Sequence, residues 1–282
     1  MDLPKSRAVA PRLEFLVTAT STNDALREAA GGADAAGWPH GAVLVTDDQT
    51  RGRGRLGRTW LAPTGKTLAI SVLLRPQDVA GGPLPSDAYG WIPLIAGAAM
   101  TEAVTRAVAA AGASAPPADP DDTSGGVEVA LKWPNDVLVS GFKVCGILSE
   151  LLPESGAVIV GAGLNLTLDE HDLPTLTSTS LLLATGVAPD ADAVLADYLA
   201  GFARLFDAFA AAGGDAEASG VAAVVAGLCG TLGSEVRVEL PGDEELLGTA
   251  ERLDADGRLV VRARENGEEQ AVAAGDVTHL RY

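Results

Sequence analysis

The stretch QTRGRGRLGRTW, residues 49–60, decides between two fold classes. Gly52, Gly54 and Gly57 satisfy the pattern G-x-G-x-x-G, which in a dinucleotide-binding fold opens directly into a helix that holds the pyrophosphate. Here a proline and a glycine follow instead, and the apolar, partly β-branched stretch 67–74 then predicts a strand. The context excludes the doubly wound dinucleotide fold and predicts a loop between two strands.

Four arginines give this loop its charge within an otherwise acidic chain: Arg51, Arg53, Arg55 and Arg58. Arginine stays charged and forms forked bonds to carboxylate and phosphate groups. The intervening glycines allow backbone N–H groups to approach an anion. The loop is therefore typical of a mobile flap that closes over an anionic intermediate and excludes water. A solvated basic turn would carry the same residues.

The segments on both sides of the loop predict an α+β domain with a mixed sheet, over residues 1–232. Period and turn residues indicate strands at 13–17, 42–46, 67–74, 127–131, 137–139, 144–152 and 157–166. Helices are predicted from Thr22 or Asn23 as the N-cap to Gly31-Gly32, over 89–111 with Gly112 as the stop, over 190–212, and in a shorter segment ending near Ala226. Residues 113–126 are almost devoid of apolar side chains and are predicted to be a flexible insertion.

The sequence pattern changes near residue 233. Short strands are predicted at 235–240, 246–253, 258–264 and 270–273. Asp256-Gly257 and Asn266-Gly267 separate them and are strong hairpin indicators. We therefore expect residues 233–282 to form a small β-barrel domain.

Composition limits the classes of function. The formal net charge is −18, which disfavours binding of nucleic acid by the bulk surface. Two cysteines, Cys145 and Cys229, cannot form a disulfide framework, so a reducing compartment is expected. The N-terminus lacks the apolar core of a signal peptide, and the longest uncharged apolar run, 91–100, is too short to span a membrane. These features predict a cytoplasmic protein.

A predicted hairpin carries two lysines. The run Lys132-Trp-Pro-Asn-Asp136 ends one strand, and Lys143 begins the returning strand, so both amines can face one ligand. A carboxylate that attacks the α-phosphate of ATP needs no general base, because it is already the nucleophile. It needs positive charge around a crowded anionic transition state, from lysine, arginine and a magnesium ion. A hairpin with solvated lysines is the alternative.

The strand at 157–166 contains two glycines and one amide. Gly161 and Gly163 could allow adenine or ribose to approach the backbone, with Asn165 bonded to nucleotide or phosphate. A strand bulge explains the same glycines.

These segments, together with Ser21-Thr22-Asn23, resemble the biotin protein ligase family, also called biotin–[acetyl-CoA carboxylase] ligases. The matching stretches in chain order are 19–23, 49–60, 132–136, 143–150 and 161–165. The resemblance spans residues 13–183 and includes the small C-terminal barrel. It implies a catalytic domain of the biotin/lipoate ligase type, an SH3-like barrel, and an ATP-dependent reaction that makes biotinyl-5′-AMP and transfers biotin to a lysine.

The resemblance also implies roles for the matching residues. The implied biotin-binding residues are Ser21, Thr22, Asn23, Gln49, Arg53, Gly54, Arg55 and Lys143. The implied ATP-binding residues are Arg53, Arg58, Trp60, Lys132, Asn135 and Asn165, and the implied catalytic residues are Lys143, Arg55 and Asp136. Magnesium is expected to arrive with ATP, with no assigned protein ligands and Asp136 as the nearest expected carboxylate.

The resemblance implies a biotin carboxyl carrier domain as partner, with no nucleic acid or membrane, in a monomer or weak homodimer. Residues 1–12 leave no room before the first predicted strand for the DNA-binding module that some bacterial members carry, so the short form is expected. Leu56 stands where an additional basic residue often occurs. The loop 169–180, which folds over adenine in the family, has no aromatic residue for stacking.

Two alternative functions remain at this point. A lipoate or octanoate ligase would share the fold group, but a fatty chain needs only an apolar tunnel, whereas a fused urea ring needs paired donors and acceptors. A biotin sensor without catalysis would bind biotin but transfer none, and the two lysines argue against it.

Overall fold

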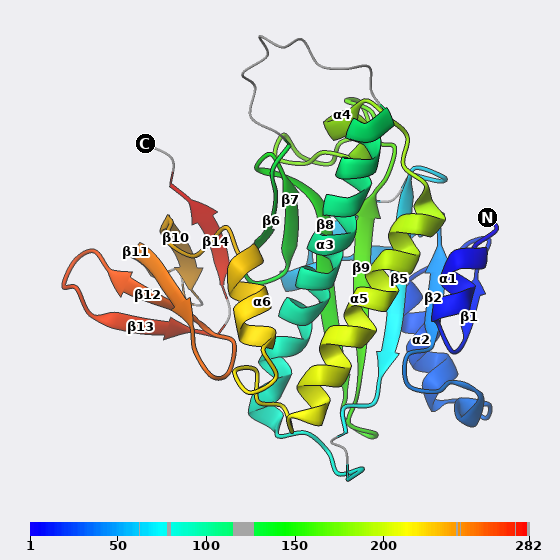
Figure 1. Cartoon of the computed structure of the whole chain (residues 1–282), viewed down its shortest axis with the longest axis horizontal. Helices are drawn as coiled ribbons and strands as arrows, with labels where there is room; N and C mark the ends of the chain where they lie inside the picture. The colour runs from blue at the N-terminus through cyan, green and yellow to red at the C-terminus, as the bar shows by residue number, and fades with distance from the viewer. Residues whose placement is uncertain are drawn as a thin grey trace.

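The computed structural model describes residues 1–61, 63–77, 80–114, 127–240, 242, 244–273 and 275–280. They form a seven-stranded sheet with the order β1-β2-β5-β9-β8-β7-β6 and a separate five-stranded sheet with the order β13-β12-β11-β10-β14 (Figure 1). In the larger sheet β1 is parallel to β2 and every other neighbouring pair is antiparallel. The predicted mixed sheet and the small C-terminal β-unit are confirmed.

The larger sheet consists of β1 (Leu13–Phe15), β2 (Val43–Thr46), β5 (Thr67–Leu74), β6 (Val129–Lys132), β7 (Asp136–Val139), β8 (Phe142–Leu152) and β9 (Ala157–Asn165). The helices are α1 (Pro4–Val9), α2 (Thr22–Gly31), α3 (Trp91–Ser114), α4 (Leu181–Thr185), α5 (Ala191–Ala211) and α6 (Val221–Leu228), with single 3₁₀ turns η1 (Ala35–Gly37), η2 (Arg55–Gly57) and η3 (Ser86–Gly90). The C-terminal sheet consists of β10 (Glu235–Leu240), β11 (Glu244–Leu253), β12 (Leu259–Ala263), β13 (Glu269–Val272) and β14 (Asp276–His279).

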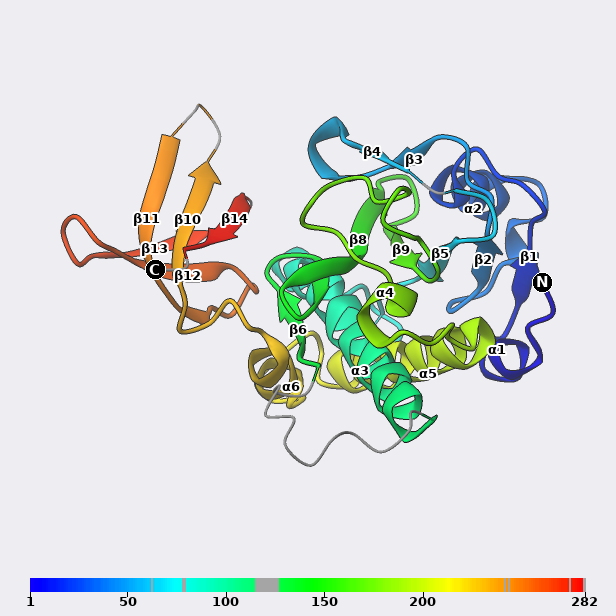
Figure 2. The ribbon, with the colours of Figure 1, turned by 90° about the horizontal axis from the view of Figure 1, so that it is seen from above.

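The two faces of the larger sheet carry different side chains. Figure 2 shows α3 and α5 on one face, and α2 with the loop hairpin of β3 (Gly52–Arg53) and β4 (Thr59–Trp60) on the other. Because side chains alternate along a strand, Ile70 and Val72 of β5 enter the core under α3 and α5, whereas Ser71 faces α2. The face under α2 is therefore free to hold polar groups.

The helix α3 is the central core helix. Together with η3 it forms a stretch, Ser86–Gly112, that is long and apolar enough to cross a membrane by length and composition alone, with a mean hydropathy of 1.3 in its most apolar window. This longer stretch includes charged residues, whereas the run 91–100 considered from the sequence is uncharged. Ile95, Ala96, Ala99 and Met100 are fully buried among the strands and α5, so packing inside the protein accounts for the apolar composition.

Several predicted boundaries were wrong for local reasons. The helix α3 continues through Gly112 to Ser114, because its alanine-rich flank sustains the helix across one glycine. Ser21, rather than Thr22 or Asn23, is the N-cap of α2, and its Oγ accepts a hydrogen bond from the Asp24 N–H at 3.3 Å. Of the predicted insertion 113–126, the first two residues belong to α3 and the remainder lies outside the described residues.

The C-terminal sheet docks through a turn of its own. The predicted hairpins at Asp256-Gly257 and Asn266-Gly267 are confirmed, with φ of 77° at Gly257 and 73° at Gly267. The Trp91 indole N–H donates to the Ala255 carbonyl at 2.7 Å, and that of Trp133 donates to the Gly257 carbonyl at 3.1 Å. Two buried tryptophans of the larger unit thus hold the β11–β12 turn.

Candidate active site

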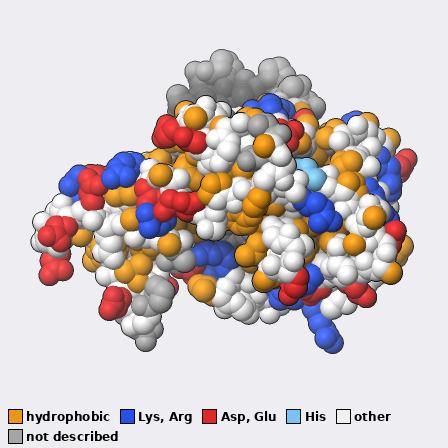
Figure 3. Space-filling view, turned by 90° about the horizontal axis from the view of Figure 1, so that it is seen from below, with side chains coloured by type: hydrophobic (Ala, Val, Ile, Leu, Met, Phe, Trp, Pro, Cys, Tyr) orange, Lys and Arg blue, Asp and Glu red, His pale blue; other side chains and the backbone are white. Residues whose placement is uncertain are grey.

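Every residue predicted for the site lines one pocket of about 350 Å³ on the α2 face of the larger sheet. They are Ser21, Thr22, Asn23, Gln49, Arg53, Gly54, Arg55, Arg58, Trp60, Lys132, Asn135, Asp136, Lys143 and Asn165. In the surface view, basic side chains gather in a hollow between the C-terminal lobe and the rest of the molecule (Figure 3). Segments far apart in the chain therefore converge as the sequence predicted.

The N-terminus of α2 forms one end of the pocket. The Thr22 backbone N–H donates to Gln49 Oε1 at 2.8 Å, and the Thr22 hydroxyl lies 3.2 Å from the same oxygen. The Asn23 amide lies between Ser71 Oγ, at 2.6 Å from its Oδ1, and Glu150 Oε2, at 2.6 Å from its Nδ2. This end is lined by fixed donors and acceptors, and we call it the ring end.

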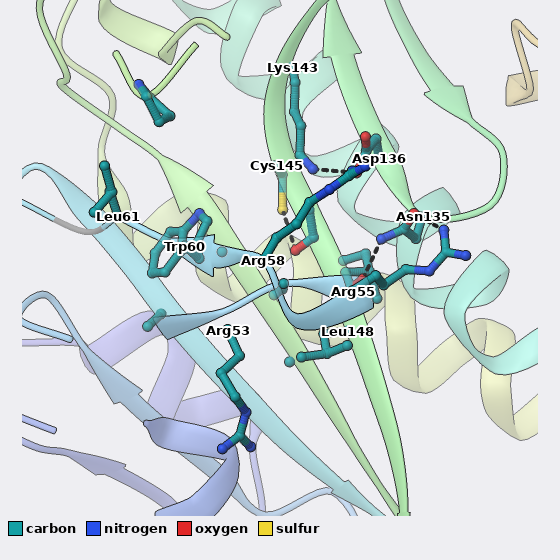
Figure 4. Close-up of a pocket in the computed structure, with 18 of the residues that line it drawn as sticks. Arg53, Arg55, Arg58, Trp60, Leu61, Asn135, Asp136, Lys143, Cys145 and Leu148 are labelled. Carbon is teal, nitrogen blue, oxygen red and sulfur yellow. Dashed lines mark hydrogen bonds and ion pairs between the residues drawn. The ribbon is translucent and has the colours of Figure 1, made fainter. Parts of the chain in front are cut away.

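The arginine loop, residues 51–58 with the flanking β3–β4 hairpin, covers the pocket, but its arginines diverge (Figure 4). Arg55 Nη1 donates to Asn135 Oδ1 at 3.0 Å, which ties the loop to the lysine hairpin. Arg58 pairs with Asp276 of β14. At the tip, Leu56 has φ 55° and ψ 34°, a left-handed conformation that is unfavourable for leucine.

Arg53 points away from Lys143 and towards α2 (Figure 4). It pairs with Asp24 at 2.6 Å and with Glu150 at 3.2 Å. The hydrogen bond from Arg53 lowers the pKa of the Asp24 carboxyl below its ordinary value. Arg53 therefore closes the outer edge of the ring end rather than facing the lysines.

The lysine hairpin forms the other end of the pocket. Lys143 Nζ lies 2.6 Å from Asp136 Oδ1, which orients the ammonium. The side chain of Lys132 is largely enclosed, and burial lowers the pKa of its ammonium below the ordinary value. Lys132 has no ion pair among the residues that the structure describes, so its charge is available to an anion.

Gly161, Gly163 and Asn165 of β9 have protein neighbours that the sequence did not indicate. A Cβ at Gly161 would lie 2.6 Å from Asn23 Oδ1, and one at Gly163 would lie 2.5 Å from the Trp60 indole. These glycines make room for Asn23 and Trp60, and the predicted approach of a nucleotide to them stays a prediction. The buried Asn165 amide donates to the Thr179 carbonyl at 2.9 Å, which holds the loop 169–180; its predicted contact with ATP stays a prediction.

Other residues that were not among the predicted site residues also contribute. Asp276 reaches the pocket from β14, Glu150 and Ser71 brace the ring end, and the loop residues Pro174, Thr175, Thr177 and Ser178 complete the wall. Asp276 and Ser71 belong to no recognisable pattern. Glu150 ends the matching stretch 143–150 and the four loop residues lie within 169–180, but none of them has an individual role that the sequence indicated. A cluster of three or more His, Cys, Asp or Glu side chains that could hold a metal does not occur among the described residues.

The contact between Asp276 and Arg58 predicts that β14 restrains the arginine loop. Asp276→Ala should remove the ion pair, and trypsin should then cut after Arg55 or Arg58 about two- to fivefold faster, since such half-exposed pairs are worth up to about 1 kcal/mol. The rate of cleavage is followed by gel and mass spectrometry. Glu251→Ala, which breaks the pair with Arg262 elsewhere in the C-terminal sheet, is the matched control. Equal acceleration by both variants would exclude a local restraint.

Comparisons with known proteins agree with this geometry. Residues 16–165 match the model of the Biotin/lipoate A/B protein ligase family, and residues 231–280 match the Biotin protein ligase C terminal domain. The chain is 37% identical over 275 residues to a biotin–[acetyl-CoA-carboxylase] ligase of Mycobacterium tuberculosis, covering 96% of this chain and 90% of that protein.

Two solved structures are similar over nearly the whole chain. The biotin protein ligase of Aquifex aeolicus, in complex with biotin and ATP, is 25% identical with a TM-score of 0.72, covering 96% of this chain and 100% of that one. The biotin protein ligase of Leishmania major, in complex with biotinyl-5-AMP, is 26% identical with a TM-score of 0.57, covering 94% and 99%. The resemblance inferred from the sequence is confirmed, and the chain belongs to the biotin/lipoate A/B protein ligase family.

Proposed function

We propose that the protein is an ATP-dependent biotin protein ligase. Biotin and ATP react to biotinyl-5′-AMP and pyrophosphate, and a lysine of a biotin carboxyl carrier domain then takes the biotinyl group. The observation that carries this proposal is the convergence of the ring end, the arginine loop and the lysine hairpin on one pocket. Relatives at this identity are named as ligases of the same kind.

The geometry suits attack by a carboxylate on phosphorus. The ring end can hold a urea at one side of the pocket while Lys143 holds the carboxylate at the other. One carboxylate oxygen bonds to the α-phosphorus, and the bond from that phosphorus to the bridging oxygen of pyrophosphate breaks. Lys132, Lys143 and Arg55 supply positive charge where negative charge accumulates. No proton has to be removed in this step, because the acid is already ionised.

The pocket favours magnesium that enters with ATP. Asp136 and Asp276, the two carboxylates among the described residues that line the pocket, are already paired with Lys143 and Arg58. The described residues offer no cage of their own, and Mg²⁺ commonly keeps waters and substrate phosphates as its ligands. When bound, the ion neutralises phosphate charge, and Asp136 is the carboxylate we propose beside it.

Transfer requires a neutral amine from the carrier. After loss of a proton to solvent, the lysine nitrogen attacks the carbonyl carbon of the anhydride. AMP leaves with the bridging oxygen, and the nitrogen releases a second proton to solvent as the amide forms. The arginine loop must exclude water during this step, since hydrolysis of the anhydride would compete. The same loop must leave a path for the carrier lysine.

The lowered pKa of Lys132 predicts a pH dependence. The ammonium attracts ATP, and because its pKa lies below that of a free lysine, its charge is lost at a correspondingly lower pH as the solution becomes alkaline. We expect the KM for ATP to rise several-fold as the pH is raised towards 10.5, the ordinary pKa of lysine, because Lys132 loses its charge below that value. Lys132→Arg retains its charge over this range and should give a flat profile. Parallel profiles for the two proteins would contradict the role of Lys132.

The decisive experiment mixes the purified protein with ATP, magnesium and either biotin or lipoate. Pyrophosphate release and mass spectrometry of the adenylate identify the acid, and an apo carrier domain tests transfer. We expect biotinyl-AMP and a biotinylated carrier. The fixed donors and acceptors of the ring end favour a urea over the dithiolane of lipoate. Turnover of lipoate alone would replace the proposal by the lipoate ligase alternative.

A further inference from the structure

Ser71 lies behind the ring end, in the middle of β5, and its side chain is fully buried. Its Oγ is 2.6 Å from Asn23 Oδ1 and 2.8 Å from Thr22 Oγ1. Thr22 and Asn23 line the pocket, whereas Ser71 does not. Ser71 therefore contacts the two residues that would meet a ligand without being able to meet it itself.

The number of protons fixes the direction of these hydrogen bonds. A serine hydroxyl has one proton, and an amide oxygen has none. The Ser71 proton must therefore lie on the short contact with Asn23 Oδ1. The Thr22 hydroxyl then donates its proton to Ser71 Oγ at 2.8 Å, in preference to Gln49 Oε1 at 3.2 Å, because that oxygen already accepts the Thr22 backbone N–H at 2.8 Å. With its proton used behind the pocket, the Thr22 hydroxyl offers only lone pairs to a ligand.

Glu150 fixes the orientation of the Asn23 amide. Asn23 Nδ2 donates to Glu150 Oε2 at 2.6 Å, and a flipped amide would place its oxygen against the carboxylate. Arg27 and Arg53 each lie 3.2 Å from Glu150 Oε1 and neutralise its charge. The chain Glu150–Asn23–Ser71–Thr22, which we call the relay, thus has one allowed polarity.

We propose that Ser71 and Glu150 are positioning residues that make Thr22 a pure acceptor, and so select acids whose ring carries an N–H. A cyclic urea meets this requirement and a dithiolane does not. The inference deepens the proposed ligase function and rests on it. In Glu150→Gln the side-chain amide accepts either orientation of Asn23, so the relay loses its fixed direction although its shape is preserved. In Ser71→Ala the connection between Asn23 and Thr22 is removed.

The test measures adenylate formation by wild type, Ser71→Ala and Glu150→Gln with biotin and with desthiobiotin, which keeps the urea but lacks the sulfur ring. Lipoate is measured as an inhibitor. We expect the KM for both ureas to rise about tenfold, the size of one lost hydrogen bond of about 1.4 kcal/mol. The kcat, the KM for ATP and the inhibition constant of lipoate should stay within about twofold, since a single hydrogen bond to the ring is lost.

Ser149→Ala is the matched control. Ser149 is a serine of the neighbouring strand β8, its Oγ is buried, and that atom has no hydrogen-bond partner within the described part of the chain. All kinetic constants should match wild type there. The relay alone would be overturned if the KM values for the ureas stayed unchanged in both relay variants. It would also be overturned if kcat/KM fell equally for every substrate. A wild-type protein that forms no adenylate with biotin would overturn both the relay and the ligase proposal.

Discussion

Lys143→Ala should reduce the rate of biotinyl-AMP formation about a thousandfold, the scale of losing one charged donor aimed at a developing negative charge. Lys143 Nζ is held 2.6 Å from Asp136 Oδ1, at the end of the pocket opposite the ring end. Removing it deletes a cation from the point where the carboxylate meets the α-phosphate. The measurement is single-turnover formation of the adenylate with saturating biotin and ATP.

Two variants make this result interpretable. The alanine leaves Asp136 without its partner, so the melting temperature and biotin binding must be recorded to separate chemistry from stability. Lys143→Arg keeps the charge but moves its donors, and we expect an intermediate rate. Lys5→Ala removes a lysine paired with Asp190, outside the pocket, and should leave the rate unchanged. Near-normal turnover of Lys143→Ala would remove this residue from the mechanism.

Gly161→Ala should raise the KM for biotin about a hundredfold while leaving ATP binding nearly intact. The added Cβ would lie 2.6 Å from Asn23 Oδ1 and 3.0 Å from its Nδ2. Asn23 must then move, and because it is bonded on both sides, to Ser71 and Glu150, its movement disrupts the ring end as a whole. A loss of about two hydrogen bonds accounts for the magnitude.

Initial rates over a range of biotin and ATP concentrations measure this effect. Gly227→Ala, at a helix position with open space around the added methyl group, is the control and should behave as wild type. A biotin KM within a few-fold of wild type in Gly161→Ala would show that Asn23 can move without weakening biotin binding. The close approach of β9 to α2 would then have no role in recognition.

The fold could be predicted where the local pattern was strong. The strand over 67–74 was predicted with the observed bounds, because an uninterrupted apolar stretch ends shortly before a proline. The helix α1 and the strand β14 were missed, since short segments near the chain ends carry little periodicity. Gly112 was given too much weight as a stop, because alanine-rich helices tolerate a single glycine at a cost of about 1 kcal/mol.

The candidate site, like the fold, could be predicted only in part. Residues within contiguous motifs were brought together as predicted, but the partners of each side chain were not predictable. Arg53 faces Asp24 and Glu150 because α2 and β8 happen to meet there, and Asp276 reaches the pocket only once the C-terminal sheet has docked. Such contacts join residues far apart in the chain. Ser71 was not recognised either, because it lies in an apolar strand and its role depends on its contacts with Thr22 and Asn23 of α2.

The tryptophans that hold the C-terminal sheet provide an optical reporter of its attachment. Trp91 and Trp133 are nearly inaccessible to water, and both indoles bond to the turn between β11 and β12. If that turn detaches, two of the chain's four indoles enter water together, and their fluorescence should shift to longer wavelength. Emission spectra recorded as carrier or nucleotide is added can therefore test in solution, without any attached dye, whether the small sheet stays in place.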